Sequence, residues 1–373
     1  MNYYIIAGEA SGDLHAANLI KALRVEDPNA DIRAWGGDLM EAAGATLVRH
    51  YRELAFMGFV EVVKNLRTIL RNIKFCKADI DAYQPDVLIL VDYPGFNLRI
   101  ANWAKERGYK VFYYIAPQIW AWHSSRIHQI KKSVDRLYTI LPFEGDFYHQ
   151  FNYETEYHGH PLVDVFAQQE PKDDIRERHQ LSELPIVALL PGSRKQEVER
   201  LLSVMLALVP RFADYQFVIA AAPALPIEAY QHIIADAGLA NNDRCQIVQN
   251  ETYDLLRVSQ AALVTSGTAT LETAILGIPQ IVCYKTSPLT YFLAKNLVEI
   301  KYISLVNLIA DQEVVPEMIQ GKCEVNELEA FLNKLLSGHQ RETMITAYEK
   351  LHTQLGETGV AKRIAKSMIE RLN

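Results

Sequence analysis

Short apolar segments alternate along the chain with longer segments in which apolar residues recur at helical spacing. The apolar segments of the N-terminal half are 3–7, 87–91, 111–115 and 136–141. Those of the C-terminal half are 186–190, 216–220, 262–265 and 280–284. Runs this short and this continuously apolar predict strands that are buried on both faces. Helical segments between such strands predict βαβ units, so we expect an α/β fold with two parallel sheets facing each other across a cleft.

A polar stretch separates the two series of predicted strands. Residues 159–174, GHPLVDVFAQQEPKDD, turn polar and contain two prolines, as linkers often do. We therefore predict an N-terminal domain over 1–168 and a C-terminal domain over 169–343. The polar stretch near 336–341 leads back toward the first domain, which 344–373 completes with a final helix near 360–372.

Composition excludes several classes of protein. The 373 residues are 49% apolar and carry a net charge of −7, which argues against a nucleic-acid-binding protein, although a local basic patch stays open. The four cysteines lie far apart without metal-ligand spacing, as is typical of reduced cytosolic thiols. The N-terminus does not resemble a signal peptide, and no segment reaches the roughly 20 apolar residues of a membrane span. We expect a soluble protein, or one bound at a membrane surface.

Polar side chains follow two predicted strands of the N-terminal half, where parallel sheets commonly bind ligands. Residues 8–13, GEASGD, open a helix whose first N–H groups are unpaired, so they either contact a ligand or merely let Ser11 or Asp13 cap the helix. Their spacing is not GxGxxG, which disfavours a dinucleotide. Asp92 ends another apolar run. It is either a cap or a general base whose pKa is raised by its low-dielectric surroundings.

Two strand ends of the C-terminal half predict a diphosphate site. Residues 191–194, PGSR, precede a helix that begins near Lys195, and a guanidinium beside helix N–H groups suits a diphosphate. The alternative is that Arg194 is an exposed loop residue. Residues 266–268, SGT, open another helix, and Glu272 one turn later either accepts hydrogen bonds from ribose hydroxyls or complements the helix dipole. Both ends fall at one edge of one sheet and can hold a nucleoside diphosphate together.

Residues 54–77, LAFMGFVEVVKNLRTILRNIKFCK, form a basic amphipathic segment. Its apolar face either lies on an anionic membrane or packs on the sheet with its charges in water. Trp120 and Trp122, followed by basic residues, form a second amphipathic candidate, although a core role for one tryptophan is equally plausible. The string Asp79-Ile80-Asp81 resembles a metal-binding DxD, but it lies within a predicted helix, so we expect no metal there.

Several motifs occur in one order over nearly the whole chain: AGEASGDLH, MGFVEV, VDYPGFN, PQIWAW, LPFE, GHPLVD, LLPGSR, SGTATLE and SLVNLIA with VPEMIQ. In these motifs the sequence closely resembles the lipid-A-disaccharide synthase family. The resemblance implies an inverting glycosyltransferase of the GT-B fold, with two Rossmann-like domains and neither a cofactor nor a metal. It implies UDP-2,3-diacylglucosamine as donor, 2,3-diacylglucosamine 1-phosphate as acceptor, a β-1,6 linkage and release of UDP. It places the protein in the cytoplasm, peripheral on the inner membrane of a Gram-negative bacterium, with a homodimer left open.

The resemblance also assigns roles to residues. Asp92 matches the family's essential aspartate, the general base for the acceptor 6-hydroxyl, and Glu9 and Ser11 match the glycine-rich loop that completes the catalytic set. The expected donor-binding residues are Gly192, Ser193, Arg194, Ser266, Gly267, Thr268, Glu272, Asn307 and Gln320. The expected membrane-contact patch is Met57, Phe59, Val62, Val63, Leu66, Ile69 and Leu70.

The sequence departs from the family pattern at two positions. Gly95 stands where a second aspartate is common, so we expect Asp92 to have no carboxylate neighbour and no rise in pKa from like charge. His123 stands where a basic residue often follows WAW, and a phosphate contact from it would be pH-sensitive. Two rival functions stay open: a sugar-nucleotide 2-epimerase on the same fold, and a non-catalytic UDP-sugar-binding protein on membranes.

Overall fold

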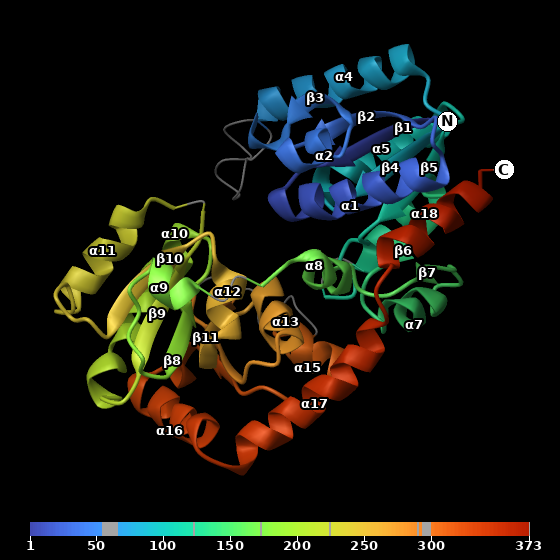
Figure 1. The fold of residues 1–373 in the computed structure, drawn as a ribbon. Helices are drawn as coiled ribbons and strands as arrows, with labels where there is room; N and C mark the ends of the chain where they lie inside the picture. Colours follow the sequence, from blue (N-terminus) through green and yellow to red (C-terminus); the bar gives the residue numbers. More distant parts are fainter. Residues whose placement is uncertain are drawn as a thin grey trace. The chain divides into compact units, whose positions relative to one another are not determined.

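The computed structural model describes residues 1–53, 66–121, 124–171, 174–223, 225–288, 291–292 and 300–372. The chain divides into two compact units, Met1–Ala167 with Leu355–Asn373, and Gln168–Gln354 (Figure 1). Each unit contains one sheet whose paired strands all run parallel. The two units are described separately below.

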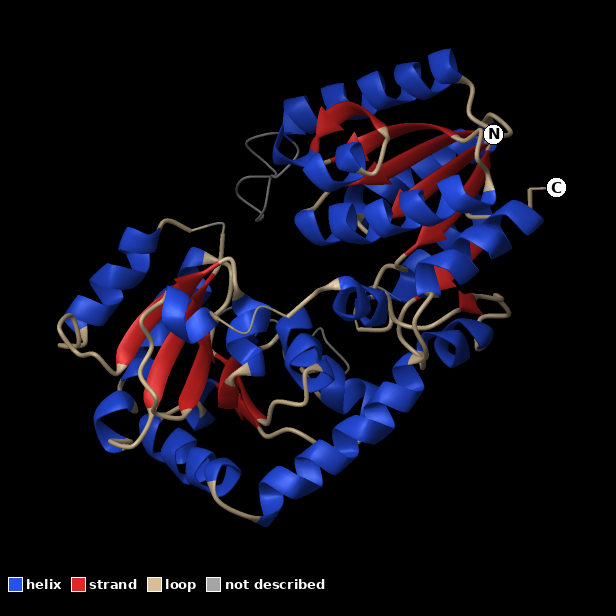
Figure 2. Cartoon of the chain, in the orientation of Figure 1, coloured by secondary structure: helices blue, strands red, loops and turns tan. Residues whose placement is uncertain are grey.

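The first unit is built on a seven-stranded sheet in the order β3-β2-β1-β4-β5-β6-β7 (Figure 2). The strands are β1 Asn2–Ala7, β2 Asp31–Gly36, β3 Thr46–His50, β4 Val87–Val91, β5 Lys110–Tyr114, β6 Arg136–Thr139 and β7 Glu156–Tyr157. The helices are α1 Ala10–Glu26, α2 Asp38–Ala42, α4 Leu66–Tyr83, α5 Pro94–Glu106, α6 Ile127–Ser133, α7 Glu144–His149, α8 Leu162–Gln168 and α18 Val360–Glu370.

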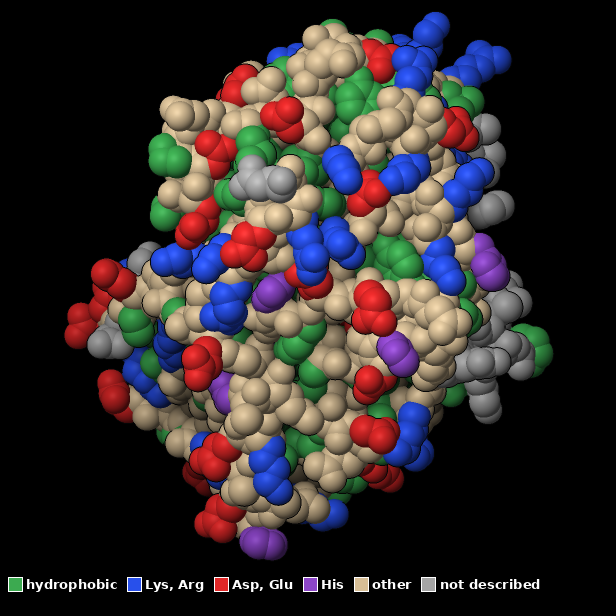
Figure 3. All heavy atoms as spheres, turned by 90° about the vertical axis from the view of Figure 1, so that its right-hand side faces the viewer, with side chains coloured by type: hydrophobic (Ala, Val, Ile, Leu, Met, Phe, Trp, Pro, Cys, Tyr) green, Lys and Arg blue, Asp and Glu red, His purple; other side chains and the backbone are tan. Residues whose placement is uncertain are grey.

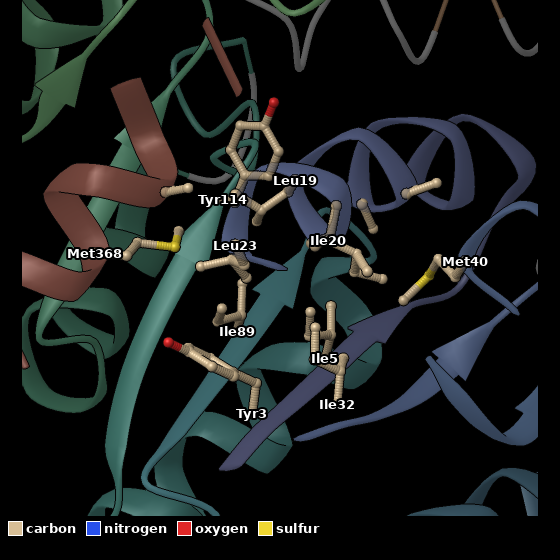
Figure 4. Close-up of a cluster of buried hydrophobic side chains, with 14 of the residues drawn as sticks. Tyr3, Ile5, Leu19, Ile20, Leu23, Ile32, Met40, Ile89, Tyr114 and Met368 are labelled. Atoms are coloured by element: carbon tan, nitrogen blue, oxygen red, sulfur yellow. The ribbon is translucent and has the colours of Figure 1, made fainter. Parts of the chain in front are cut away.

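Consecutive apolar residues bury both faces of this sheet, because neighbouring side chains of a strand point to opposite faces. Tyr3 and Ile5 of β1 pack in one cluster with α1 and α18, which lie side by side on that face (Figure 4). Tyr4 and Ile6 pack in a second cluster with α4, α5 and α6. The helices after β1 and β4 therefore lie on opposite faces of the sheet.

The second unit is built on a six-stranded sheet in the order β10-β9-β8-β11-β12-β13. The strands are β8 Ile186–Leu190, β9 Gln216–Ala221, β10 Cys245–Gln249, β11 Ser259–Thr265, β12 Gln280–Tyr284 and β13 Glu317–Ile319. The helices are α9 Ile175–Arg178, α10 Lys195–Leu206, α11 Ile227–Asp236, α12 Thr252–Arg257, α13 Thr268–Ile275, α15 Leu305–Ala310, α16 Val325–Leu336 and α17 His339–Leu355. Short 3-10 turns occur in both units, at Tyr51–Glu53 and Ser124–Arg126 in the first and at Val209–Arg211 and Gln320–Lys322 in the second.

The return of the chain to the first unit differs from the expectation. The first boundary falls after Ala167, but the chain rejoins the first unit at Leu355 rather than near 344. Packing explains this difference, because Tyr348 of α17 is buried in the second unit and accepts a hydrogen bond from the Gln280 side chain at 3.2 Å. Of the helices near the C-terminus, α18 is the one that belongs to the first unit. Asp164 fixes the N-terminus of α18, because its carboxylate accepts hydrogen bonds from three backbone N–H groups there.

The described surface carries both signs of charge. On the face in Figure 3, acidic and basic side chains are interspersed, with small apolar areas between them. No helix within the described ranges is long and apolar enough to cross a membrane. All four cysteines are buried and free of disulfides.

Candidate active site

Most of the predicted catalytic and donor-binding residues follow the strands at the switch point of each sheet, whereas Asn307 and Gln320 lie elsewhere in the second unit. In the first sheet β2 lies on one side of β1, and β4, which comes later in the chain, lies on the other side. In the second sheet β9 lies on one side of β8, and β11, which comes later in the chain, lies on the other side. Ligands of open parallel sheets bind at such points, outside the carboxyl ends of the strands. The segments after β1 and β4 thus share one site, and those after β8 and β11 share another.

The glycine-rich segment after β1 packs directly against the segment after β4. A Cβ atom on Gly8 would lie 2.3 Å from ring atoms of Tyr93, so only glycine fits beneath this ring. Glu9 occupies the N-cap of α1 and is half-buried, while Ser11 is exposed in the first turn. Within the described chain no side chain caps α1; Asp13 instead accepts from the backbone N–H groups of α2, at 2.7 Å from Gly37. The capping alternative for Ser11 is therefore not supported.

Asp92 adopts an unusual backbone conformation at the end of β4. Its φ is +46° and that of Tyr93 is +50°, a left-handed geometry that costs non-glycine residues about 1–3 kcal/mol each. The Asp92 carbonyl accepts hydrogen bonds from the Tyr113 hydroxyl at 2.6 Å and from the Asn97 amide at 2.8 Å. These bonds offset part of the strain and fix the residue.

The pKa of the Asp92 carboxyl is raised from 3.8 to about 6, chiefly by burial and also by the charge of Glu9, while a hydrogen bond from the Tyr93 N–H partly lowers it. The expectation that Asp92 lacks a carboxylate neighbour is therefore wrong, since Glu9 supplies one from the adjacent strand end. A carboxyl with a pKa near 6 is ionised at neutral pH and still basic enough to accept a proton.

Glu144 orders the segment after β5. It is fully buried, accepts from the Trp120 indole N–H at 3.2 Å and from two backbone N–H groups, and burial raises its pKa to about 7. The Trp120 ring meets Phe143 edge to face at 5.0 Å between centroids. Trp120 thus has structural partners, whereas Trp122 and His123 lie outside the described residues.

In the second unit, the turn after β8 presents Arg194 to solvent. Gly192 has a φ of +109°, and a Cβ there would lie 2.8 Å from Glu197 and 3.3 Å from Thr265 of β11. Arg194 is the N-cap of α10, its side chain is 70% exposed, and it pairs with Glu197 at 3.1 Å. Because an exposed pair of this kind contributes roughly 1 kcal/mol or less, the guanidinium can exchange it for a phosphate. Ser193 is exposed beside it.

The turn after β11 lies on the neighbouring strand, since Val264 pairs with Leu190 of β8. The Ser266 hydroxyl donates to the Ile303 carbonyl at 2.8 Å, which fixes the turn. Gly267 has open space where a Cβ would lie, and Thr268 is exposed at the first turn of α13. A helix N-terminus left open in this way suits anionic oxygens.

Glu272 lies one turn into α13 with its carboxyl largely buried. It forms a hydrogen bond with Tyr253, and burial raises its pKa. A bond from this carboxylate to a ribose would require the Tyr253 contact to be shared or exchanged, so the ribose role stays a prediction.

Asn307 is fully occupied by protein partners. Its amide donates to the Val315 carbonyl and to Glu317, and accepts from the backbone N–H groups of Val314 and Val315, all within 2.9 Å. Its side chain has no exposed surface. A direct donor contact from Asn307 is therefore not supported, and its role in donor binding becomes an indirect one.

Glu317 was not identified from the sequence, although it lies within VPEMIQ. It accepts from the N–H groups of Ile303 and Ser304 and from Asn307, and so holds the loop whose carbonyl receives Ser266. A glutamate inside a three-residue strand gives no sequence signal for this task.

Gln320 borders a cavity of about 730 Å³ at the ends of β12 and β13. Its φ is +51°, and its amide pairs with the backbone N–H and carbonyl of Thr286. The other described residues around the cavity are Arg200, Lys285, Ser287, Pro288, Tyr291, Phe292, Gly321 and Glu324.

The predicted membrane patch is described only in part. Met57, Phe59, Val62 and Val63 lie outside the described residues, as does the side chain of Leu66, where α4 begins. Ile69 packs partly into the core, whereas the Leu70 side chain is 53% exposed between the exposed Arg67 and Arg71. The face is therefore divided, with Ile69 turned to the sheet and Leu70 to solvent.

Comparisons with known proteins find relatives over nearly the whole chain. A family model for lipid-A-disaccharide synthetase matches residues 3–370. A lipid-A-disaccharide synthase of Syntrophus aciditrophicus is 40% identical over 97% of this chain and 95% of its own length. One from Myxococcus xanthus is 37% identical over 99% of this chain and 97% of its own length.

Solved structures share the fold at low identity. A UDP-GlcNAc 2-epimerase of Methanocaldococcus jannaschii, in complex with UDP-GlcNAc and UDP, aligns with a TM-score of 0.66 and 13% identity, over 99% of this chain and all of its own. The glycotransferase of kitacinnamycin aligns with a TM-score of 0.68 and 12% identity, over 100% and 98%. These likenesses support the GT-B fold, and the sequence matches settle the relationship: the chain belongs to the lipid-A-disaccharide synthase family.

Proposed function

We propose that this protein transfers 2,3-diacylglucosamine from UDP-2,3-diacylglucosamine to the 6-hydroxyl of 2,3-diacylglucosamine 1-phosphate. The products are the β-1,6-linked lipid A disaccharide 1-phosphate and UDP. The observation that carries this proposal is the family match over residues 3–370, which includes both strand-end sites. As a member of that family, the chain is a glycosyltransferase that forms the lipid A disaccharide.

Asp92 acts as the general base in this proposal. Its carboxylate accepts the proton of the acceptor 6-hydroxyl, and that oxygen attacks the anomeric carbon from the face opposite UDP. The raised pKa of about 6 supports this role, because the group is ionised at neutral pH and basic enough to take a proton. Glu9 raises the pKa of Asp92 through its charge, and Ser11 lies exposed on the same segment, available to the acceptor.

The second unit holds the donor. Arg194 and the N–H groups at the start of α10 and α13 neutralise the diphosphate and stabilise the charge that grows on it as the sugar departs. Gly192, Ser193, Gly267 and Thr268 let phosphate oxygens approach the backbone. Ser266 and Asn307 keep this surface in place.

Further donor contacts are assigned to Glu272 and Gln320. Glu272 receives the ribose hydroxyls, and Gln320 borders the cavity that takes the part of the donor beyond the diphosphate. The cavity volume of about 730 Å³ lies within the range of small-ligand sites.

The substrates are lipids, so the protein works at a membrane surface. We assign this contact to the segment that ends in α4, where exposed Leu70 and Phe75 stand among Arg67, Arg71 and Lys74. Apolar side chains between cations suit an anionic membrane. In this proposal the surface is the cytoplasmic face of the inner membrane of a Gram-negative bacterium. A homodimer is compatible with this arrangement and not required by it.

One assay tests the function directly. The protein is incubated with UDP-2,3-diacylglucosamine and radiolabelled acceptor in detergent, and the products are separated. A labelled disaccharide and equimolar UDP are expected. An epimer formed from a UDP-sugar alone would indicate the epimerase, and donor binding without UDP release would indicate a binding protein.

A further inference from the structure

The backbone after β4 bends in a way that amino-acid side chains other than glycine rarely allow. Asp92 and Tyr93 have consecutive φ values of +46° and +50°. Two consecutive residues in this region are strained, so contacts from other elements are needed to hold them there. Such strain in the backbone of a proposed catalytic residue points to a supporting structure around it.

Both backbone polar groups of Asp92 bond to buried partners. Its N–H donates to the Tyr114 carbonyl of β5 at 3.1 Å. Its carbonyl accepts from the Tyr113 hydroxyl of β5 at 2.6 Å and from the Asn97 side-chain amide of α5 at 2.8 Å. Tyr113 and Asn97 have no exposed surface, so both donor side chains are shielded from water.

The Asn97 amide lies between two strand ends. Its nitrogen is also 3.2 Å from the Val91 carbonyl of β4 and 3.3 Å from the Ile6 carbonyl of β1. A side chain shared in this way ties the end of β4 to that of β1, which leads to Glu9. Asn97 therefore fixes the two loops relative to each other as well as the bend itself.

The Tyr113 hydroxyl is a polar group inside an apolar cluster. The tyrosine ring packs among the aliphatic and aromatic side chains on the α5 face of the sheet, where a phenylalanine ring would fill the same space. Burial and the charge of Asp92 raise the pKa of Tyr113, so its hydroxyl remains protonated and able to donate. Its bond to the Asp92 carbonyl is thus a specific polar contact that apolar packing does not require.

We propose that Tyr113 and Asn97 are positioning residues: by clamping the carbonyl of Asp92, they hold its backbone in the left-handed bend that aims the carboxylate at the acceptor hydroxyl. This inference rests on the proposed role of Asp92 as general base. Without the clamp the peptide relaxes toward an ordinary conformation and the carboxylate shifts. A shift of about 1 Å can lower turnover by roughly 100-fold.

The central variant is Tyr113→Phe, which removes one hydroxyl. A matched control is Tyr138→Phe in β6, because Tyr138 is equally buried in the same unit and its hydroxyl meets Ser367 at 3.2 Å, away from Asp92. We expect kcat of Tyr113→Phe to fall by about 10- to 100-fold, with the KM for the UDP-sugar within about twofold. Tyr138→Phe should keep both constants within about twofold of the parent, even if its melting temperature drops as much.

A double-mutant cycle separates positioning from general stability. If Tyr113 acts through the Asp92 carboxylate, adding Tyr113→Phe to Asp92→Asn should lower the residual kcat by less than about twofold. Wild-type kcat in Tyr113→Phe, or an undiminished loss in the Asp92→Asn background, would overturn the inference while leaving the base role intact. Near-normal turnover of Asp92→Asn would instead refute the base role itself.

A second variant covers the case in which Tyr113→Phe does not fold. Asn97→Ser removes the other donor to the Asp92 carbonyl, and the same fall in kcat with little change in KM is expected. If Asn97→Ser unfolds cooperatively and its kcat stays within about twofold of the parent, the inference is contradicted.

Discussion

Replacing Asp92 by Asn separates the chemistry of this carboxylate from the cost of burying its charge. The folded-state pKa of about 6 lies above the ordinary value of 3.8, so the folded protein binds this proton more tightly than the unfolded chain does. Stability is therefore lost as pH rises through the window between these values. At 1.36 kcal/mol per pH unit, the full cost is about 3 kcal/mol above pH 6.

The Asp92→Asn variant carries no buried charge, so it lacks this destabilisation, and it also lacks the carboxylate that acts as the general base. We expect Asp92→Asn to unfold with a free energy up to about 3 kcal/mol higher than the parent at pH 8, a difference that shrinks to roughly 0.5 kcal/mol at pH 4. Its turnover should fall by roughly 10²–10⁴. A more stable and less active protein is what a strained catalytic group predicts.

The first unit can be followed by its own fluorescence, because the four tryptophans of the chain, Trp35, Trp103, Trp120 and Trp122, all belong to it. Urea titrations at pH 4, 6 and 8 would give the unfolding free energies, and disaccharide formation would give the turnover. Exposed Asp146→Asn in the same unit is the control for the loss of one carboxylate charge. Equal stability of Asp92→Asn and parent at all three pH values would refute the burial argument, and near-normal turnover would refute the base role.

Three further substitutions test other parts of the site. Glu9→Gln removes the charge beside Asp92, so the acidic limb of kcat/KM should move below pH 6, and an unmoved limb would exclude the coupling. Arg194→Ala should weaken UDP binding in calorimetry by about 10- to 100-fold, whereas Lys195→Ala, an exposed neighbour, should change it by less than about threefold. Leu70→Ser should reduce sedimentation with anionic vesicles while Val25→Ser, which alters an even more exposed apolar side chain on α1, should not; equal effects would argue against α4 as the contact.

The sequence predicts those strands that are apolar on consecutive positions. All eight apolar runs overlap a strand, and three of them, Val87–Val91, Ile186–Leu190 and Gln280–Tyr284, have the expected bounds. The strands it misses include β3, at one edge of the first sheet, whose residues are mostly half-buried, and β13, at one edge of the second, which has three residues. Edge strands need less apolar surface, so they leave no continuous run to find.

Site residues are predictable where the chain itself places them at a strand end, and not where the sheet order decides their neighbours. Asp92 and Arg194 follow buried runs and are found by that position. The effect of Glu9 on Asp92 depends on β1 lying next to β4, which the local sequence does not state. Likewise Asn307 resembles a ligand contact in sequence, and only its four bonds to protein groups assign it to the scaffold.

Strand order also explains why these sites remain open to ligands. The helices that follow β1 and β4 pack on opposite faces of the first sheet, so neither covers the carboxyl ends of both strands. Glu9 and Asp92 are left between these two helices, at the position where parallel sheets that reverse their winding commonly bind ligands. In the second sheet Ala269 of α13 packs against the cluster that includes Ile186 and Val218, and the strand order reverses between β8 and β11 in the same manner. The two candidate sites therefore arise from one topological feature used twice, and their different chemistry comes from the residues at each: half-buried carboxyls in the first unit, an exposed guanidinium and open helix ends in the second.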